Sequence, residues 1–205
     1  MAKARFFYAL RPDAATAERL AALAAQVAAR WGGRAFVADD LHLTLAFVGM
    51  RPIDEQPSLE AILRGLPSRL VAGADPQRPP LALSRLGSFG HGVLWIGPPA
   101  REGPPDFVHR LADEVRARLR AARIDFDDRP LKLHATLVRG ARGFDASGRG
   151  QAHPQAPAPG SAAVPRSETY VAREWSLALG AADPASTPQR RYRWSHPEPD
   201  RMETV

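Results

Sequence analysis

The chain has 205 residues, a formal net charge of +6 at pH 7, 44% hydrophobic and 24% charged residues, and no cysteine. This composition is that of a globular protein, and it excludes disulfides, thiolate catalysis and cysteine metal sites. Neither a membrane-spanning apolar run nor the apolar region of a signal peptide is present, so we expect a cytoplasmic protein. The pI of about 10.6 favours anionic partners, nucleic acid first, although the compositional bias of a GC-rich genome would raise the pI equally.

The first half of the chain predicts a strand, a helix and a second strand in that order. Residues 4–10 are rich in aromatics and contain no breaker, which is typical of a strand. Apolar residues at three- and four-residue steps predict an amphipathic helix over 14–31, and alternation predicts a strand over 41–48. A short helix is expected over 58–67. The two faces of the 41–48 strand would carry Leu41, Leu43, Leu45 and Phe47 on the core side, and His42, Thr44 and Ala46 on the polar side.

The second half of the chain repeats this order. Residues 92–99 predict a strand that proline ends, 105–122 predict an amphipathic helix, and 131–138 predict an alternating strand. Because both the elements and their spacing recur, we expect an internal duplication of the fold.

Three segments lie outside the duplicated pattern. Residues 141–167 consist largely of Gly, Pro, Ala and Ser and are too poor in large apolar side chains to pack, so we expect a flexible insert loop. Two strands are expected within 170–180 and 190–195, followed by a polar tail over 196–205. The expected organisation is a single domain over 1–195 that the insert interrupts.

A Leu-His-x-Thr-Leu motif occurs once in each half of the chain. Residues i and i+2 of a strand point to the same side, so His42 shares a face with Thr44, and His134 shares a face with Thr136. If a pseudo-twofold axis relates the halves, the two pairs face each other across a groove. A single such motif would be explained by strand packing, but two at equivalent places favour a catalytic site.

Two imidazoles and two hydroxyls suit phosphate-ester chemistry. A neutral imidazole can take a proton from water while a protonated one gives a proton to a leaving alkoxide, and the ordinary histidine pKa near 6.5 lets both forms exist near neutral pH. The threonine hydroxyls can donate hydrogen bonds to the non-bridging phosphate oxygens. A metal hydrolase is disfavoured, since two histidines without a nearby carboxylate pattern make a poor metal site.

Other residues are weaker candidates. Arg139 follows the second motif and could bind a phosphate, but strict alternation would point it to the core unless the strand bends. Phe7 could stack on a base, although an aromatic residue in an apolar strand is more often part of the core. The remaining histidines lie in turns, a helix or flexible segments and are expected to be non-catalytic: His91, His109, His153 and His196.

The paired motifs, with "RFFYAL" at the start, "LHLTLAFVG" after the first helix and "RPLKLHATLVRG" later, resemble the 2H phosphoesterase superfamily. Within it the sequence is most similar to the bacterial RNA 2',3'-cyclic phosphodiesterases, also called 2'-5' RNA ligases. The resemblance covers residues 4–140 in order and 168–195 loosely. It implies a bilobal α+β fold with two pseudo-symmetric lobes, each an antiparallel sheet with outer helices, and an active-site groove between them.

The resemblance also implies an activity and its residues. The expected reaction is metal-independent hydrolysis of RNA 2',3'-cyclic phosphate ends, or of a nucleotide cyclic phosphate, to a 2'-phosphomonoester, without a cofactor. Apart from the resemblance, we expect a monomer. His134 would be the base and His42 the acid, and the substrate-binding residues would be Thr44, Thr136, Arg139 and Phe7. Alternatives are a 2'-5' RNA ligase acting on tRNA halves and a non-catalytic RNA-binding module. The serine that the family usually has near its penultimate strand has no counterpart in "LALGAAD".

Overall fold

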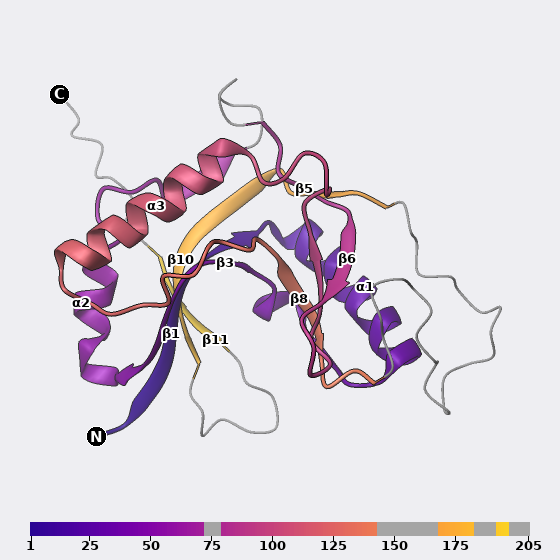
Figure 1. Cartoon of the computed structure of the whole chain (residues 1–205), viewed down its shortest axis with the longest axis horizontal. Helices are drawn as coiled ribbons and strands as arrows, with labels where there is room; N and C mark the ends of the chain where they lie inside the picture. The colour runs from indigo at the N-terminus through magenta and orange to yellow at the C-terminus, as the bar shows by residue number, and fades with distance from the viewer. Residues whose placement is uncertain (72–78, 143–167, 183–191, 197–205) are drawn as a thin grey trace.

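The computed structural model describes residues 1–71, 79–142, 168–182 and 192–196 (Figure 1). Nearly all of the predicted insert and tail therefore lie outside the described residues. In chain order the elements are β1 (Lys3–Pro12), α1 (Ala14–Trp31), β2 (Arg34–Ala35), the 3-10 turn η1 (Ala38–Asp40), β3 (Leu43–Pro52), the turn η2 (Ile53–Glu55), α2 (Gln56–Ala61), β4 (Arg69–Val71), β5 (Ala82–Leu83), β6 (Arg85–Ser88), β7 (Leu94–Gly97), α3 (Asp106–Ala121), β8 (Ala135–Arg139), β9 (Tyr170–Val171), β10 (Glu174–Ala182) and β11 (Tyr192–Ser195).

The main sheet places the two motif strands side by side at its centre. Its strand order is β11-β10-β1-β3-β8-β7-β6, with β2 added to β8 and β4 added to β10, while β5 and β9 form a separate two-stranded sheet. Neighbouring strands are antiparallel. A single residue pair, Leu43 opposite Ala135, joins β3 to β8. The sheet thus divides into two halves at that pair, and the predicted α+β fold is confirmed.

The two halves of the sheet share one packing arrangement next to their motif strands. In the first half, Phe7 of β1 lies opposite Gly180 of β10, and in the second, Trp95 of β7 lies opposite Gly87 of β6. In both cases the aromatic ring occupies the space where a Cβ atom of the glycine would stand. Each half therefore supports its motif strand with an aromatic ring packed over a glycine.

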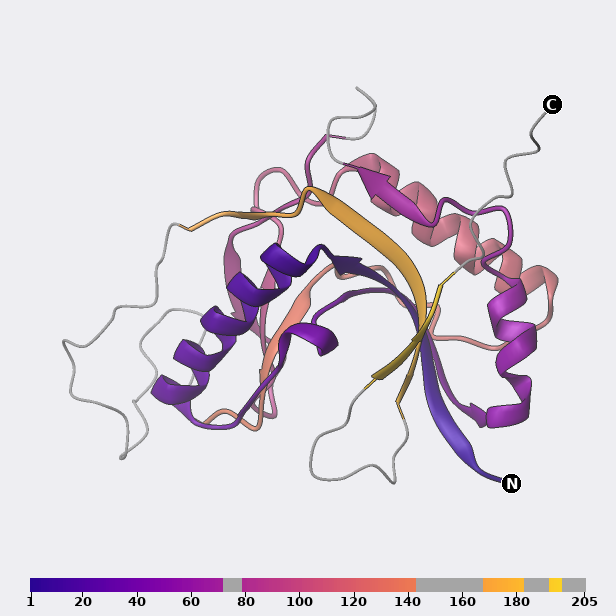
Figure 2. The same cartoon turned by 180° about the vertical axis from the view of Figure 1, so that it is seen from behind.

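The long helices cross between the halves. Helix α1 follows β1 but contacts β8 and β2, whereas α3 follows β7 but contacts β3 (Figures 1 and 2). Asp13 caps α1 by accepting a hydrogen bond from the Thr16 N–H at 2.8 Å. The apolar residues that predict the two helices are buried: Leu20, Leu23, Val27 and Trp31 in α1, and Val108, Leu111, Val115 and Leu119 in α3. None of the described helices combines the length and the hydrophobicity that crossing a membrane requires.

Both motif strands contain a β-bulge at the same place. Leu45 is skipped in the pairing of β3 with β1, and Leu137 is skipped in the pairing of β8 with β7. Each bulge shifts the alternation by one residue, because the extra residue leaves two consecutive side chains on the core side. The prediction that Phe47 faces the core is therefore wrong: its side chain is 38% exposed and lies opposite Phe7.

The strand and helix boundaries also differ from those predicted. Regular pairing begins at Leu43 and at Ala135, so each histidine stands immediately before its strand rather than within it. The expected helix over 58–67 is shorter and earlier, at Gln56–Ala61.

The packing of Phe7 over Gly180 predicts a coupled destabilisation. A Cβ atom on Gly180 would approach Phe7 Cε2 to 2.6 Å and also crowd the Trp194 ring, so Gly180→Ala should lower the free energy of unfolding by about 1–3 kcal/mol. Urea unfolding would measure this in the wild type and in a Phe7→Leu background, where the smaller side chain should reduce the cost. An equal cost in both backgrounds would contradict the contact.

Candidate active site

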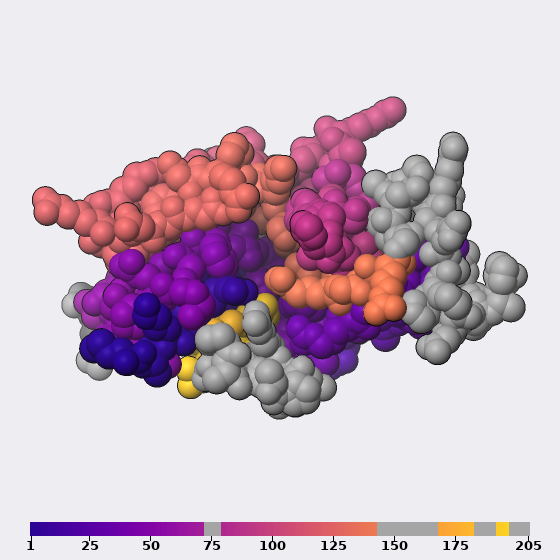
Figure 3. Space-filling model, turned by 60° about the horizontal axis from the view of Figure 1, so that its bottom comes forward, coloured from indigo at the N-terminus to yellow at the C-terminus, as the bar shows by residue number. Residues whose placement is uncertain are grey.

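The two histidines meet where the halves of the sheet join. Because Leu43 lies opposite Ala135 in an antiparallel pair, the flanking positions of the two strands lie next to one another across the junction. These flanking residues point away from the buried face to which Leu43 and Ala135 belong. The structure therefore brings the four predicted residues of the two motifs onto one face: His42, Thr44, His134 and Thr136. Figure 3 shows the surfaces of β3 (violet), β8 (orange) and β11 (yellow) coming together around a hollow.

Both imidazoles are held in the same way. His42 Nδ1 lies 2.6 Å from the Asp40 carbonyl oxygen, and His134 Nδ1 lies 2.6 Å from the Lys132 carbonyl oxygen. A carbonyl oxygen can only accept, so each Nδ1 carries the proton and donates it. In the neutral ring Nε2 then has the free lone pair, and this nitrogen is the one available to a substrate.

Aromatic rings surround His42. The Phe7 ring stacks on the imidazole with centroids 4.7 Å apart, and Tyr192 and Trp194 approach it edge-on at 5.1 and 5.4 Å. Burial lowers the pKa of His42 to about 4, against the opposing effect of the Asp40 carbonyl. Positive charge on His134, Arg139 and Arg11 lowers it further.

His134 has a smaller aromatic wall of the same kind. Phe89, in the turn between β6 and β7, contacts its imidazole edge-on at 4.6 Å and stacks on Trp95 at 5.0 Å. Burial is the main cause that lowers the pKa of His134, followed by the charge of Arg139. Phe89 remains 40% exposed, so this side of the site is more open to solvent than the His42 side.

The bulge in β8 supplies the bend that Arg139 needs to reach the site. With Leu137 and Val138 both buried, Arg139 turns to the face of His134 and is exposed. Its guanidinium lies 5.8 Å from the centre of the Phe36 ring. The charge of Arg139 lowers the pKa of both histidines, which places it within electrostatic reach of each.

Comparisons with known proteins match both the first motif and the whole fold. Residues 10–95, which include His42 and Thr44, match the family model of LigT-like phosphoesterases. E. coli LigT complexed with 3'-AMP is 22% identical with a TM-score of 0.62, and LigT complexed with ATP is 26% identical with a TM-score of 0.56, each over 96% of both chains. A protein of Thermus thermophilus is 25% identical over 95% of both chains, with a TM-score of 0.54. The resemblance to the 2H phosphoesterases is confirmed. No curated protein sequence matches the chain.

Within this LigT-like fold, Phe7 is not free to stack on a base. Its side chain is only 3% exposed and packs between the His42 imidazole and Gly180. Substrate binding by Phe7 stays a prediction. The contact that the structure shows is between Phe7 and the imidazole of His42. The remaining described histidines stand apart from the motif strands: His91 in the β6–β7 turn, His109 in α3 and His196 after β11; His153 lies outside the described residues.

Sequence reasoning missed the aromatic residues of the site. Tyr192 and Trp194 alternate along β11, a pattern that predicts a shared face but not its neighbour. The backbone N–H of Tyr192 donates to Asp40 Oδ1 at 3.1 Å, and the Trp194 indole donates to the Asp39 carbonyl at 3.0 Å. These bonds fasten β11 to η1, which also carries the carbonyl that holds His42.

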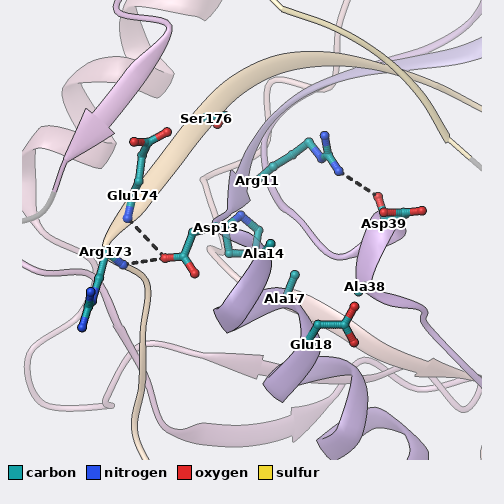
Figure 4. Close-up of a pocket in the computed structure, with 11 residues that line it drawn as sticks. Arg11, Asp13, Ala14, Ala17, Glu18, Ala38, Asp39, Arg173, Glu174 and Ser176 are labelled. Atoms are coloured by element: carbon teal, nitrogen blue, oxygen red, sulfur yellow. Dashed lines mark hydrogen bonds between the residues drawn. The ribbon is translucent and has the colours of Figure 1, made fainter.

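A cavity of about 550 Å³ lies behind the His42 side of the LigT-like fold (Figure 4). Arg11 forms part of its wall, donates to the Asp39 carbonyl at 3.4 Å and lies 4.7 Å from the centre of the Trp194 ring. Asp13 accepts hydrogen bonds from the backbone N–H groups of Arg173 and Glu174. The polar groups around this cavity thus bind one another and support the chain behind the site.

Among the described residues, no three histidine, aspartate or glutamate side chains come close enough to hold a metal ion. Metal-independent activity stays a prediction.

The shared effect of Arg139 on the two histidines predicts a titration shift. Because its positive charge opposes protonation of both rings, Arg139→Gln should raise the pKa of His42 and of His134. NMR titration of the imidazole resonances would measure both values, with Arg101→Gln as the control for an exposed arginine outside the site. Unchanged pKa values in the Arg139 variant would contradict the placement.

Proposed function

We propose that the protein hydrolyses RNA 2',3'-cyclic phosphate ends to 2'-phosphomonoesters without a metal ion. The observation that carries the proposal is the matched pair of imidazoles, each with Nδ1 bound to a backbone carbonyl and Nε2 free, on one face of the β3–β8 junction. The family match to LigT-like phosphoesterases supports phosphoester chemistry at this site. E. coli LigT forms complexes with 3'-AMP, ATP and NADP+, which supports a nucleotide as the group that is bound here.

The reaction needs one proton acceptor and one proton donor. Nε2 of the neutral histidine takes a proton from water as the water oxygen bonds to phosphorus. The bond from phosphorus to the 3'-oxygen breaks, and the protonated histidine gives its Nε2 proton to that oxygen, which leaves a 3'-hydroxyl and a 2'-phosphate. Each turnover exchanges the protonation states of the two rings, and proton exchange with solvent restores them.

The hydroxyls and the arginine stabilise the charge that develops on the phosphate. Thr44 and Thr136 share the face of the histidines, so their hydroxyls can donate to the two non-bridging oxygens. Arg139 adds a guanidinium that can donate to the same oxygens and offsets their negative charge. The aromatic walls exclude water, which strengthens each of these interactions.

The acidities of the two rings favour His42 as the base and His134 as the acid. A pKa of about 4 keeps His42 neutral at physiological pH, which suits the proton acceptor. His134 is less enclosed by aromatic rings, and its protonated form is easier to maintain near the solvent-exposed Phe89. This assignment is the reverse of the one that the family resemblance implies.

Two alternative functions are a 2'-5' RNA ligase, which would use the same histidines, and an RNA-binding module, which would not need them. A 2'-5' RNA ligase would use the same site, with the 5'-hydroxyl of a second RNA attacking the cyclic phosphate in place of water. The bond from phosphorus to the 3'-oxygen then breaks, and a 2'-5' phosphodiester forms. An RNA-binding module would keep its RNA affinity after both histidines are replaced.

Replacement of either histidine should remove most of the activity. We expect His42→Ala and His134→Ala to lower kcat for an RNA 2',3'-cyclic phosphate by about 10²–10⁴-fold, the usual contribution of a general acid or base. Product analysis by chromatography should show a 2'-phosphate in the wild type, in the presence of EDTA as well as in its absence. His109→Ala, on α3, is the control for loss of a histidine outside the site.

The same variants assign the two roles. A nitrophenyl phosphodiester leaves without a proton, so the variant that lacks the acid should cleave it at nearly the wild-type rate, and the variant that lacks the base should not. On our assignment the active variant is His134→Ala. Wild-type rates for the RNA substrate in either alanine variant would refute the catalytic pair.

Lowered pKa values on both histidines predict an acidic optimum. The productive form has one ring protonated and one neutral, so it is lost when the pH rises above the higher pKa or falls below the lower one. Burial lowers both pKa values from the ordinary 6.5, that of His42 to about 4. We expect kcat/KM to peak below pH 6.5 and to fall about tenfold per pH unit above the higher pKa. A maximum above pH 7.5 would contradict the pKa shifts.

A further inference from the structure

A second arginine stands directly opposite Arg139. Arg34 of β2 pairs with Arg139 of β8 in antiparallel register, and both guanidinium groups lie over the same ring, 5.6 and 5.8 Å from the centre of Phe36. Like charges directly opposite one another across two strands destabilise a sheet. None of the ion pairs between described side chains involves either arginine. The fold thus places two positive charges side by side at the edge of the site, neither of them in an ion pair with a described side chain.

Phe36 holds the two arginines in place. Its side chain is 4% exposed, and its backbone N–H donates to the Leu137 carbonyl at 2.8 Å, so the ring is fixed against β8 at the bulge. A guanidinium over an aromatic face keeps its outer N–H groups free to donate to an anion.

Arg139 and Arg34 lie at different distances from the histidines. The charge of Arg139 lowers the pKa of both histidines, whereas Arg34 stands across from Arg139 on β2, at the end of β8 that is farthest from His134. Both charges also reach the phenol of Tyr192: burial raises its pKa, as does the Asp40 carboxylate, while Arg139, Arg34 and Arg5 oppose that rise. Positive charge therefore begins at the histidines with Arg139 and continues away from them through Arg34.

On the basis of the proposed function, we infer that Arg34 binds the phosphate on the 5' side of the terminal nucleotide. In an RNA that ends in a 2',3'-cyclic phosphate, the next phosphate is attached to the 5'-oxygen of the same nucleotide, and all others lie beyond it. With the cyclic phosphate at the histidines and Arg139, Arg34 stands beside Arg139, where its guanidinium can receive this second anion. The preferred substrates are then RNA ends and 5'-phosphorylated nucleoside cyclic phosphates rather than unphosphorylated nucleoside cyclic phosphates.

The test compares three substrates that share one reactive group: adenosine 2',3'-cyclic phosphate, its 5'-phosphorylated form, and a dinucleotide that ends in the cyclic phosphate. Arg34→Gln should lower kcat/KM about 10- to 100-fold for the two substrates that carry the second phosphate, the range expected for a lost hydrogen bond between charged groups. It should leave adenosine 2',3'-cyclic phosphate unchanged. The salt dependence of log kcat/KM for the dinucleotide should flatten by about 0.7.

The matched control is Arg30→Gln. Arg30 is an exposed arginine on α1 that also lies over an aromatic ring, 4.9 Å from the centre of Trp31, but it does not affect either histidine. It should leave all three substrates unchanged. Thermal unfolding of Arg34→Gln should occur at the wild-type temperature or above it, because the substitution removes a like-charge pair.

An equal loss on all three substrates would overturn the inference by assigning Arg34 to the reacting phosphate or to the fold, and no loss on any would remove its role. Binding measurements separate this result from the fate of the proposed function. By calorimetry, Arg34→Gln should weaken adenosine 2',5'-bisphosphate about 10- to 100-fold and adenosine 2'-phosphate not at all. That comparison needs no turnover, so it decides the role of Arg34 even if the wild type hydrolyses none of the cyclic phosphates.

Discussion

One residue pair determines the site. Leu43 and Ala135 form the junction between the two halves of the sheet, and each follows a histidine directly. Because the pair is antiparallel, the residues that flank it on both strands share one face, and the two motifs converge without any further device. The helices secure the junction, since α1 packs on the motif strand of the second half and α3 packs on that of the first. Separation of the halves would therefore expose the buried core residues of both halves.

The site combines two features that lower the stability of the fold. His42 is enclosed by Phe7, Tyr192 and Trp194, and its pKa is lowered to about 4, so protonation of this ring is costly in the folded state. The arginine pair Arg34 and Arg139 places like charges opposite one another. Features of this kind accumulate at functional sites, where a bound anion supplies the missing partner charge. A phosphate at the histidines would offset both.

Local sequence patterns correctly predicted the helices and strand segments in which buried side chains recur at one regular spacing. The helices over 14–31 and 105–122 have their predicted apolar residues buried, and the His-x-Thr pairs share a face because two residues on a strand are enough to fix it. The bulges at Leu45 and Leu137 broke the same reasoning further along each strand, since pairing with a distant strand decides where an extra residue is accommodated. Phe47 was therefore assigned to the wrong face, while Arg139 reached the site through the bend that alternation alone does not contain. Tyr192 was missed because β11 is brought to the site by its pairing with β10 and by its bonds to Asp39 and Asp40, which are distant in the sequence.

The proposed mechanism needs two matched imidazoles that keep Nδ1 protonated and Nε2 free. The most direct test is a measurement of the nitrogen chemical shifts of His42 and His134 in the free protein as the pH is varied. We expect both rings at neutral pH to be the tautomer with the proton on Nδ1, with a pKa of about 4 for His42 and a value below 6.5 for His134. A proton on Nε2 of either neutral ring, or a pKa of His42 at or above 6.5, would contradict this mechanism.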